Sequence, residues 1–294
     1  MAEINQETCK KCGLCAKACS AKIIIKVEGK YRVTSLPDWD CIECGLCMAV
    51  CPTESIKVPS LKYEDMPAIP RGKVNFNSFY NMILPRRSIR SYKKDAVSKD
   101  VLKSILDAVA TAPMGVPPSK VEVLVFDRRS DIEELLDDVA KGYEGFLSIM
   151  RNPIMRGIFR LIYGGAVYHI LKTHVIPAAR IATDWRKRGR DCFSYDAPAM
   201  MLFHGSRFGE SIVEDCWIAA TYASLAAHSL GLGTCFIGMI PPIIDRDKKL
   251  KRRLCIAEKN RVTACLLLGY PDIKFKRVIP RVLGGVRYTS KIKT

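Results

Sequence analysis

Eight cysteines near the N-terminus constrain this chain more than any other feature. They fall in two runs, Cys9, Cys12, Cys15 and Cys19, then Cys41, Cys44, Cys47 and Cys51. Both runs have the same spacing, with two, two and three residues between successive cysteines. Four thiolates per run favour 4Fe–4S clusters, and two matched runs predict two clusters side by side. Such a chain would be built to move single electrons.

Zinc and disulfide bonds are the alternatives for these cysteines. Zinc sites usually pair two Cys-x-x-Cys units a dozen or more residues apart, without a third cysteine in the same register. Disulfides need an oxidising compartment. The chain begins with the polar stretch MAEINQETCKK, and no apolar signal segment precedes Cys9. We therefore expect a cytoplasmic protein that carries clusters.

Residues 9–52 resemble a bacterial two-cluster ferredoxin. The second run ends in Cys51-Pro52, as in that family, although the first ends in Cys19-Ser20. In such ferredoxins the fourth cysteine of each run serves the other cluster. The resemblance therefore implies two ligand sets, Cys9, Cys12, Cys15 with Cys51, and Cys41, Cys44, Cys47 with Cys19.

Both runs also share their surroundings. Gly13 and Gly45 follow the second cysteine of each run, where we expect a positive φ. Ile56–Val58 after the second run mirrors Ile23–Ile25 after the first, which indicates an internal duplication. Between the runs, Ile23–Val27 and Tyr31–Thr34 flank Glu28-Gly29-Lys30 and predict a hairpin.

The sequence divides into a small domain, a linker and a large domain. We expect a ferredoxin domain over residues 1–60, a proline-containing linker over 61–77 and one substantial core over 78–294. In the large domain, apolar patterns and capping residues predict helices and strands that would form a layered α+β fold. The helices are expected over Ser98–Ala112, from a capping box at Ser130–Glu133 and over Glu210–Leu230, and the strands over Val121–Phe126, Ala199–Phe203 and Val262–Leu268.

The net charge is +17, and residues after position 60 carry +16 of it. A basic balance is typical of proteins that bind nucleic acid, an anionic membrane surface or phosphorylated cofactors. Aromatic residues do not interleave with the basic runs, so we expect no nucleic-acid partner. The charge-free run Leu161–Leu171 is far shorter than the ~20 residues of a membrane span, so we expect no span.

From Pro85 the chain reads PRRSIRSY, which places Arg86, Arg87 and Arg90 close to Ser88 and Ser91. Arginine side chains bind phosphate oxygens in pairs, and serine hydroxyls add short hydrogen bonds. Taken alone, this segment is a weak signal for phosphate binding, and an exposed basic loop is the favoured interpretation.

Residues 85–92 resemble the opening of the FMN-dependent nitroreductase family, and further landmarks of that family follow in order. They are Ala112-Pro113-Met114-Gly115, Ala197-Pro198, Gly231–Gly238 (GLGTCFIG) and Leu268–Pro271 with Lys274, Lys276 and Arg277. The resemblance covers roughly residues 78–285. It implies a three-layer α-β-α domain with a mostly antiparallel sheet, bound FMN and a homodimer with the flavin at its interface.

The resemblance also assigns residues to the flavin, but no side chain as a catalyst. It places Arg86, Arg87, Ser88 and Arg90 at the phosphate and ribityl end, Pro113, Met114 and Gly115 at the ring, Ile237 and Gly238 at the ring through their backbone, and Lys274 and Lys276 at the phosphate, where Arg277 is an equal candidate. The family's usual Asn and Gln after the Ala-Pro segment are here Pro117 and Ser119, so part of the ring's polar contacts must differ.

Residues 141–190 have no clear counterpart in minimal family members. They mix apolar runs with scattered arginines, and they contain His169 and His174. Three interpretations stay open, which are extra helices covering the core or the dimer, a lid over the flavin, and a helix lying in a membrane interface.

The sequence thus predicts an oxidoreductase in which two clusters pass electrons to FMN, which reduces a small acceptor such as a nitroaromatic or a quinone. The donor would be a one-electron donor protein or NAD(P)H. Since no GxGxxG segment is present, a nicotinamide would stack on the flavin. The alternatives are a non-catalytic electron carrier or redox sensor with the same cofactors, and a cluster protein that binds nucleic acid.

Overall fold

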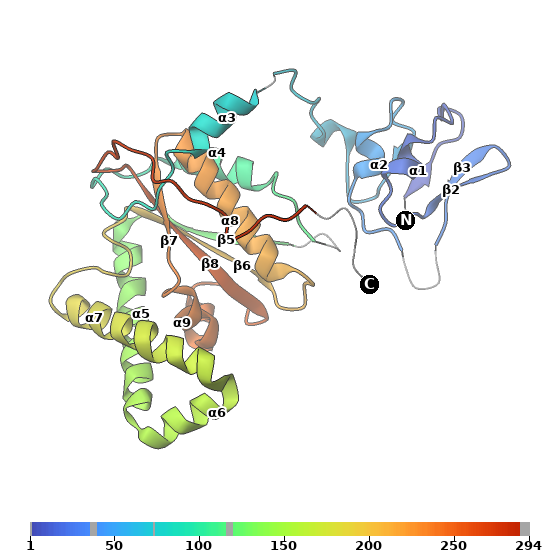
Figure 1. Cartoon of the computed structure of the whole chain (residues 1–294). Helices are drawn as coiled ribbons and strands as arrows, with labels where there is room; N and C mark the ends of the chain where they lie inside the picture. The colour runs from blue at the N-terminus through green and yellow to red at the C-terminus, as the bar shows by residue number, and fades with distance from the viewer. Residues whose placement is uncertain (1, 36–39, 73, 116–119, 289–294) are drawn as a thin grey trace.

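The computed structural model describes residues 2–35, 40–72, 74–115 and 120–288. A small unit at the N-terminus is joined by an extended connection to a larger body built around one sheet (Figure 1). None of the helices in these ranges combines the length and the apolar character that crossing a membrane requires.

The small unit is built from short elements around the cysteine runs. Strand β1 (Glu3–Ile4) pairs antiparallel with β4 (Ile56–Lys57). The predicted hairpin is confirmed as β2 (Ile24–Val27) and β3 (Lys30–Val33). Helices α1 (Leu14–Ala18) and α2 (Leu46–Ala49) each begin inside a cysteine run.

The backbone of this unit repeats itself with an offset of 32 residues. Gly13 and Gly45 both have the expected positive φ, at 76° and 75°, and each precedes a helix. Non-glycine residues share the pattern, since φ is positive at Lys11 and Glu43 and again at Lys22 and Glu54. The two runs therefore adopt one local conformation, as the expected duplication requires.

The connection between the two parts contains little regular structure. It holds a 3₁₀ turn, η1 (Tyr63–Asp65), before helix α3 (Phe76–Ile83). Asn75 caps α3, because its side chain accepts a hydrogen bond from the Ser78 backbone N–H. Helix α3 thus begins two residues before the expected start of the large domain.

The body contains a four-stranded sheet whose neighbouring strands are all antiparallel. Its order is β5 (Glu122–Phe126), β6 (Ala199–Ser206), β8 (Asn260–Gly269) and β7 (Gly233–Phe236). The three predicted strands are confirmed, and β6 and β8 both extend beyond their expected ends. Strand β7 lies at one edge of the sheet, next to β8.

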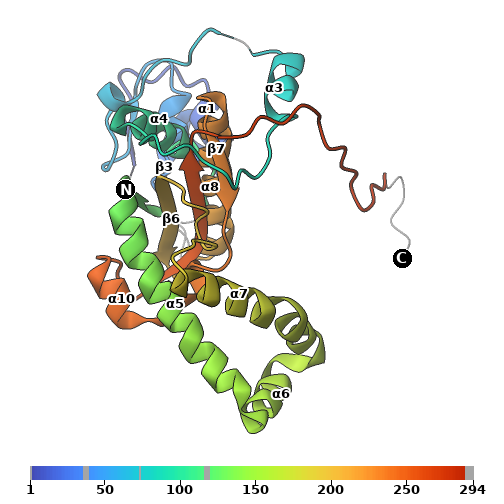
Figure 2. The ribbon, with the colours of Figure 1, turned by 90° about the vertical axis from the view of Figure 1, so that its left-hand side faces the viewer.

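Helices cover both faces of the sheet (Figure 2). Helices α4 (Lys99–Val109) and α8 (Ile212–Ser229) pack on one face, and α5 (Arg129–Arg151), α7 (Ile176–Lys187), α9 (Pro241–Arg246) and α10 (Lys248–Arg253) lie toward the other. Along β6, Met201 points into the first core and Met200 and Leu202 into the second. Successive strand residues face opposite sides, so both layers bury apolar side chains. The three-layer α-β-α prediction is confirmed.

Residues 141–190 form a helical arm that projects from the body (Figures 1 and 2). Helix α5 continues into it, and α6 (Pro153–Ile170), a π-helical turn η2 (Leu171–Val175) and α7 return the chain. Helix α6 is kinked at Gly164, where φ is 82°. The expected capping box is wrong, because α5 begins at Arg129 and Ser130 lies inside the helix, with its hydroxyl bonded to Asp131.

Asp191 links the segment that follows α7 to the start of α5. Its carboxylate accepts hydrogen bonds from the backbone N–H groups of Phe193 (2.8 Å) and Ser194 (2.9 Å) and pairs with Arg129 at 2.9 Å. Burial opposes ionisation, yet the bonds from Ser194, Asp196 and Arg129 hold the pKa of Asp191 below its usual value. A depressed folded-state pKa means that this stabilisation is present at neutral pH and is lost as the pH falls through that pKa.

Asp191→Asn should therefore lower the free energy of unfolding at neutral pH by about 2–3 kcal/mol, since charged hydrogen bonds are lost. Denaturant unfolding at neutral and acidic pH measures this free energy. The difference in unfolding free energy between variant and wild type should become smaller at acidic pH. Asp184→Asn is the matched control, because Asp184 pairs with Arg188 at the exposed surface. Equal losses in the two variants would show that Asp191 has no special role.

Candidate cofactor sites

The structure gathers the eight cysteines into two groups of four. One pocket of the small unit is lined by Cys9, Cys12, Cys15 and Cys51, and another by Cys19, Cys41, Cys44 and Cys47. Each group takes three cysteines from one run and the last cysteine of the other run. This is the grouping that the ferredoxin resemblance implies.

The pockets suit ligands that carry positive charge. Backbone N–H groups donate to sulfur, from Lys11 to Cys9 at 3.4 Å and from Ser55 to Cys51 at 3.3 Å, which favours thiolates. Burial, together with the nearby thiols of the same group, raises the pKa of Cys47 to about 11. Four clustered thiolates therefore need a cationic centre among them, as iron supplies.

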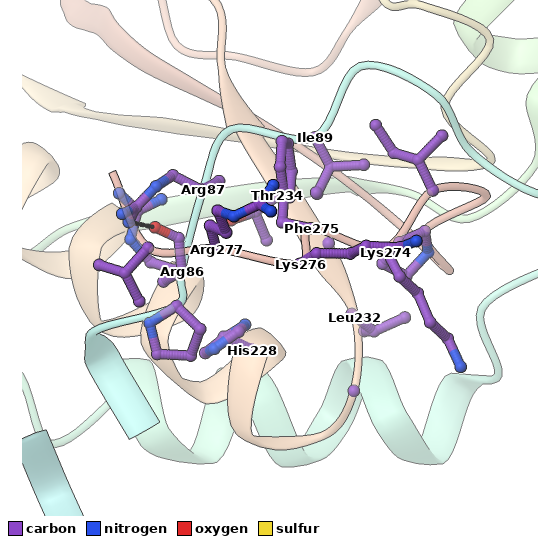
Figure 3. A pocket seen from close by; sticks show the side chains of 16 residues that line it. Arg86, Arg87, Ile89, His228, Leu232, Thr234, Lys274, Phe275, Lys276 and Arg277 are labelled. Atoms are coloured by element: carbon purple, nitrogen blue, oxygen red, sulfur yellow. Dashed lines mark hydrogen bonds between the residues drawn. The ribbon is translucent and has the colours of Figure 1, made fainter. Parts of the chain in front are cut away.

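A second kind of site lies in the body, in a cavity of about 430 Å³ (Figure 3). Three segments line it, the chain after α3, the turn between α8 and β7, and the chain after β8. Its side chains include five permanent cations and one histidine, which are Arg86, Arg87, Lys274, Lys276, Arg277 and His228. A volume of this size is typical of small-molecule sites.

Backbone contacts hold the arginine segment against strand β7. Ser88 forms a parallel bridge with Thr234, and the Ile89 N–H donates to the Thr234 carbonyl at 2.9 Å. Gly233 allows this approach, because a Cβ there would lie 2.5 Å from the Ile89 side chain. The Lys93 N–H then donates to the Tyr270 carbonyl at 2.9 Å, beyond the end of β8. The segment therefore behaves as a short addition to the sheet edge.

The cavity concentrates positive charge without compensation. Burial, with Arg87 and Arg281 nearby, lowers the pKa of Arg86. Within the described ranges, no ion pair joins the cavity's arginines or lysines to a carboxylate. A bound anion would relieve this repulsion, and arginine forks match phosphate oxygens.

Arg87 also stabilises the backbone around the basic cavity. Its guanidinium donates to the carbonyls of Leu84 at 3.0 Å and Ile279 at 2.9 Å, which ties the C-terminal segment to the arginine segment. Its Nε is buried and has no partner among the described residues. Arg87 can therefore hold the chain and still offer one N–H to a ligand.

A further cavity of about 430 Å³ lies at the other end of β7, between the body and the arm. Gly238 and Met239 form its body side together with Arg246 from α9, and Tyr143, Phe146, Phe159 and His174 contribute from the arm. Gly233 lines the basic cavity and Gly238 lines this one, and the five residue steps between them span at most about 16 Å at a strand rise of about 3.3 Å per residue. An elongated ligand with a phosphate at one end could follow β7 between them.

Two family models match the chain in sequence order. The model of the 4Fe-4S dicluster domain matches residues 2–58, and that of the nitroreductase family matches residues 83–270. The second match spans more than half of the chain.

The chain belongs to the nitroreductase family.

Similar proteins agree with this family. A protein of Methanothermobacter thermautotrophicus, provisionally named NADH dehydrogenase/NAD(P)H nitroreductase, is 26% identical over 204 residues, which is 68% of this chain and 81% of that protein. A structure titled FMN-dependent nitroreductase from Clostridium difficile R20291 is 18% identical with a TM-score of 0.52, and covers 73% of this chain and 100% of that chain. The structure of a BluB-like flavoprotein from Clostridium difficile 630 is 17% identical with a TM-score of 0.50. The match covers 69% of this chain and 94% of that chain. These two structures show that the fold is shared.

The expected site residues of this nitroreductase-family chain are brought together only in part. Arg86, Arg87, Lys274, Lys276 and Arg277 meet in the basic cavity. Ser88 and Arg90 do not line it. Both lie near the thiol of Cys235, and the Arg90 guanidinium sits 5.8 Å from the centre of the Tyr195 ring.

The segment expected at the flavin ring, Pro113–Gly115, lies far from the basic cavity. The Gly115 N–H donates to Asp215 Oδ1 at 2.9 Å near the start of α8, whereas His228, near the end of α8, lines the basic cavity. A helix rise of 1.5 Å per residue separates these two positions by about 20 Å. Pro113 and Met114 adjoin Gly115, while Pro117 and Ser119 lie outside the described residues.

Sequence reasoning noted His174 but missed Arg246 and the arm's aromatic residues. His169, the other candidate in the arm, does not line the cavity beside Gly238. The missed residues come from α5, α6 and α9, whose approach depends on how the arm folds back. No spacing pattern in the sequence signals that approach.

Proposed function

We propose that this protein is an iron–sulfur flavoprotein oxidoreductase, in which two 4Fe–4S clusters pass electrons to FMN for the two-electron reduction of a small acceptor. The basic cavity, whose cations have no acidic partner in the described ranges, carries this proposal together with the two four-cysteine groups in the same chain. A ferredoxin-like unit would be of little use to a nitroreductase domain that took electrons from a nicotinamide alone.

The cysteine groups would each hold one cluster. Cys9, Cys12, Cys15 and Cys51 surround one position, and Cys19, Cys41, Cys44 and Cys47 surround the other. The donated N–H bonds to Cys9 and Cys51 stabilise negative charge on sulfur, which is one of the means by which a protein sets a cluster's potential.

The body would hold FMN along β7. Arg86, Arg277 and the lysines of the C-terminal segment fit its phosphate, and the backbone at Ile237 and Gly238 would face its ring. The Ile237 N–H already donates to the Cys265 carbonyl at 3.0 Å, which fixes this turn at the end of β7. FMN can take up electrons singly and deliver them in pairs, while the protein supplies position and electrostatics.

The cavity beside Gly238 would receive the acceptor. Its walls are mainly apolar and aromatic, from Tyr143, Phe146 and Phe159, with Arg246 and His174 as the polar groups. Such a lining suits a flat, apolar, electron-poor molecule whose oxygens accept hydrogen bonds, as in a quinone or a nitroaromatic. The same proposal includes a cytoplasmic location. It also includes one-electron donor proteins or NAD(P)H as the electron source.

An anaerobic panel of quinones, nitroaromatics and enones tests this function. With a reduced one-electron donor, we expect turnover of at least one of these classes, and Phe159→Ala should raise the KM for that acceptor. Absence of turnover with every acceptor and with both donor types would instead favour a non-catalytic carrier or redox sensor.

The same proposal includes a homodimer. Helix α8 packs on the sheet with one side and presents an exposed stripe of Trp217, Ile218 and Tyr222 on the other. The C-terminal segment adds Val282 and Leu283, which make little contact with their own chain. A second copy would cover both surfaces, and its own Pro113–Gly115 segment could then approach a flavin held in the first copy.

Ile218→Arg should weaken this dimer by about 100-fold, because an unpaired charge would enter a buried interface. Light scattering after size-exclusion chromatography measures the mass, and flavin absorbance measures retained FMN, which should fall with it. Ile25→Arg is the matched control, because Ile25 is similarly exposed on the small unit. A dimer unaffected by Ile218→Arg would contradict the proposed interface.

A further inference from the structure

The outer end of the helical arm exposes a large apolar surface. On α6, Ile154, Ile158 and Leu161 recur at intervals of four and three residues, so they share one face of the helix. Ile154 is 70% exposed and Leu161 is 85% exposed. Ile162, next to Leu161, is 68% exposed.

This outer face is separate from the arm's own core. Met150, Leu171 and Ile176 form a small buried cluster between the arm's helices, and Phe159 of α6 packs against it. Exposed apolar side chains on a neighbouring face of α6 therefore add nothing to the arm's internal packing. Contiguous exposed apolar surface of this kind marks an interaction site in a folded protein.

The same end of the arm is basic and contains no acid. Residues 145–183 include neither Asp nor Glu. They carry five exposed cations, Arg151, Arg156, Arg160, Lys172 and Arg180. None of these five forms an ion pair with any residue that the structure describes.

The base of the arm is different. There, Arg186 pairs with Glu133 and Asp137, and Lys187 pairs with Glu144 at 2.9 Å. Positive charge is thus balanced where the arm meets the body and unbalanced where the apolar face is exposed. The combination indicates a partner that is both apolar and anionic.

We propose that the end of the arm, centred on α6, docks on an anionic lipid surface. Amphipathic helices bind such surfaces by burying apolar side chains at the headgroup boundary while flanking arginines and lysines contact lipid phosphates. The kink at Gly164 ends the first part of α6 just after the exposed Leu161 and Ile162, which places them at a bend. Helix α6 would lie in the interface and would not cross the bilayer.

A second copy of the chain is a less suitable occupant. If the arm ends of two copies packed against each other across a twofold axis, the same patch would lie on both sides. Two acid-free, basic surfaces would then face each other, and like charges across an interface are unfavourable. An anionic lipid surface offers the opposite charge.

Docking would also position the cavity beside Gly238. Phe159, Leu171 and His174 of the arm line that cavity, so a docked arm would hold it near the lipid surface. The docking proposal does not depend on the proposed redox function, because membrane binding can be measured without turnover.

Vesicle flotation of the full-length holoprotein tests this proposal. We expect binding to vesicles of phosphatidylcholine mixed with phosphatidylglycerol, little binding to phosphatidylcholine alone, and release at high salt. The triple variant R151Q/R156Q/R160Q should bind about 100-fold more weakly, at about a fivefold loss for each arginine removed. Its matched control is K120Q/K249Q/K259Q, which removes the same charge from exposed lysines outside the arm and should bind normally.

The apolar contribution is tested by L161E/I162E, which should bind at least about tenfold more weakly. Ile69→Glu is its control, because Ile69 is an exposed apolar residue of the connecting segment. Equal binding to both vesicle types, or no effect of either arm variant, would overturn the proposal. Absence of vesicle binding with a change of oligomeric state in L161E/I162E would also overturn it, and would show that the face joins copies of this chain.

Discussion

The double variant Cys51→Ala/Cys44→Ala should lose both clusters, whereas Cys51→Ala/Cys12→Ala should lose only one. The reason is that Cys51 lines the pocket of Cys9, Cys12 and Cys15, although it belongs to the second run. Cys44 lines the other pocket with Cys19. Anaerobic iron analysis should give about eight atoms per wild-type chain, about four in the C51A/C12A protein and almost none in the C51A/C44A protein.

These two variants remove the same number of thiols, so each is the control for the other. The FMN content should stay near one per chain in both, which shows that the body remains folded. If each run instead held its own cluster, the iron counts of the two variants would be exchanged. That exchange would contradict the pairing of the cysteines between runs.

Arg86→Ala should weaken FMN binding by about 30- to 150-fold, because a charge-assisted phosphate contact is worth about 2–3 kcal/mol. Arg86 lines the basic cavity and lies partly buried beside Arg87 and Arg281. Titration of the flavin-free protein with FMN, followed by flavin fluorescence, measures the change. Removing Arg86 should also relieve repulsion, so the protein's thermal stability without FMN should not fall.

Two other variants test whether the position and the planar shape of the Arg86 guanidinium matter in addition to its charge. Arg86→Lys keeps the charge but loses the planar fork, and we expect an intermediate affinity. Arg90→Ala is the matched control from the same segment, because Arg90 contacts Tyr195 and does not line the cavity. If Arg90→Ala weakened FMN binding more than Arg86→Ala, the phosphate would not lie where we propose.

The sequence predicted the parts of the fold that depend on local patterns. Regular spacing identified the cysteine runs and the positive φ at Gly13 and Gly45, because a cluster's ligands and tight turns require particular residues at fixed positions. Runs of buried apolar residues identified β6 and β8, since both faces of these strands are covered. The start of α5 was placed wrongly, because Ser130 and Glu133 resemble a capping box although Glu133 instead pairs with Arg129 and Arg186.

Long-range packing limited the prediction of the site. The cavity beside Gly238 brings that residue together with Phe159 and Arg246, and no local sequence pattern predicts this contact. Family resemblance likewise groups Arg90 with Arg86, whereas in the structure Arg86 lines the basic cavity and Arg90 lies against Tyr195. The sequence marks residues 141–190 as an insertion. Their charge asymmetry points to a docking surface only together with the exposed apolar face of α6, and that face depends on how the arm folds.

Transfer of electrons from the clusters to FMN is the central claim, and rapid anaerobic mixing tests it most directly. The holoprotein is mixed with a reduced one-electron donor protein, and the cluster and flavin absorbances are followed together. We predict that the clusters are reduced first and the flavin afterwards, and that flavin reduction in the cluster-free Cys51→Ala/Cys44→Ala protein is slower by at least about tenfold. Equally fast flavin reduction in the two proteins would contradict this account.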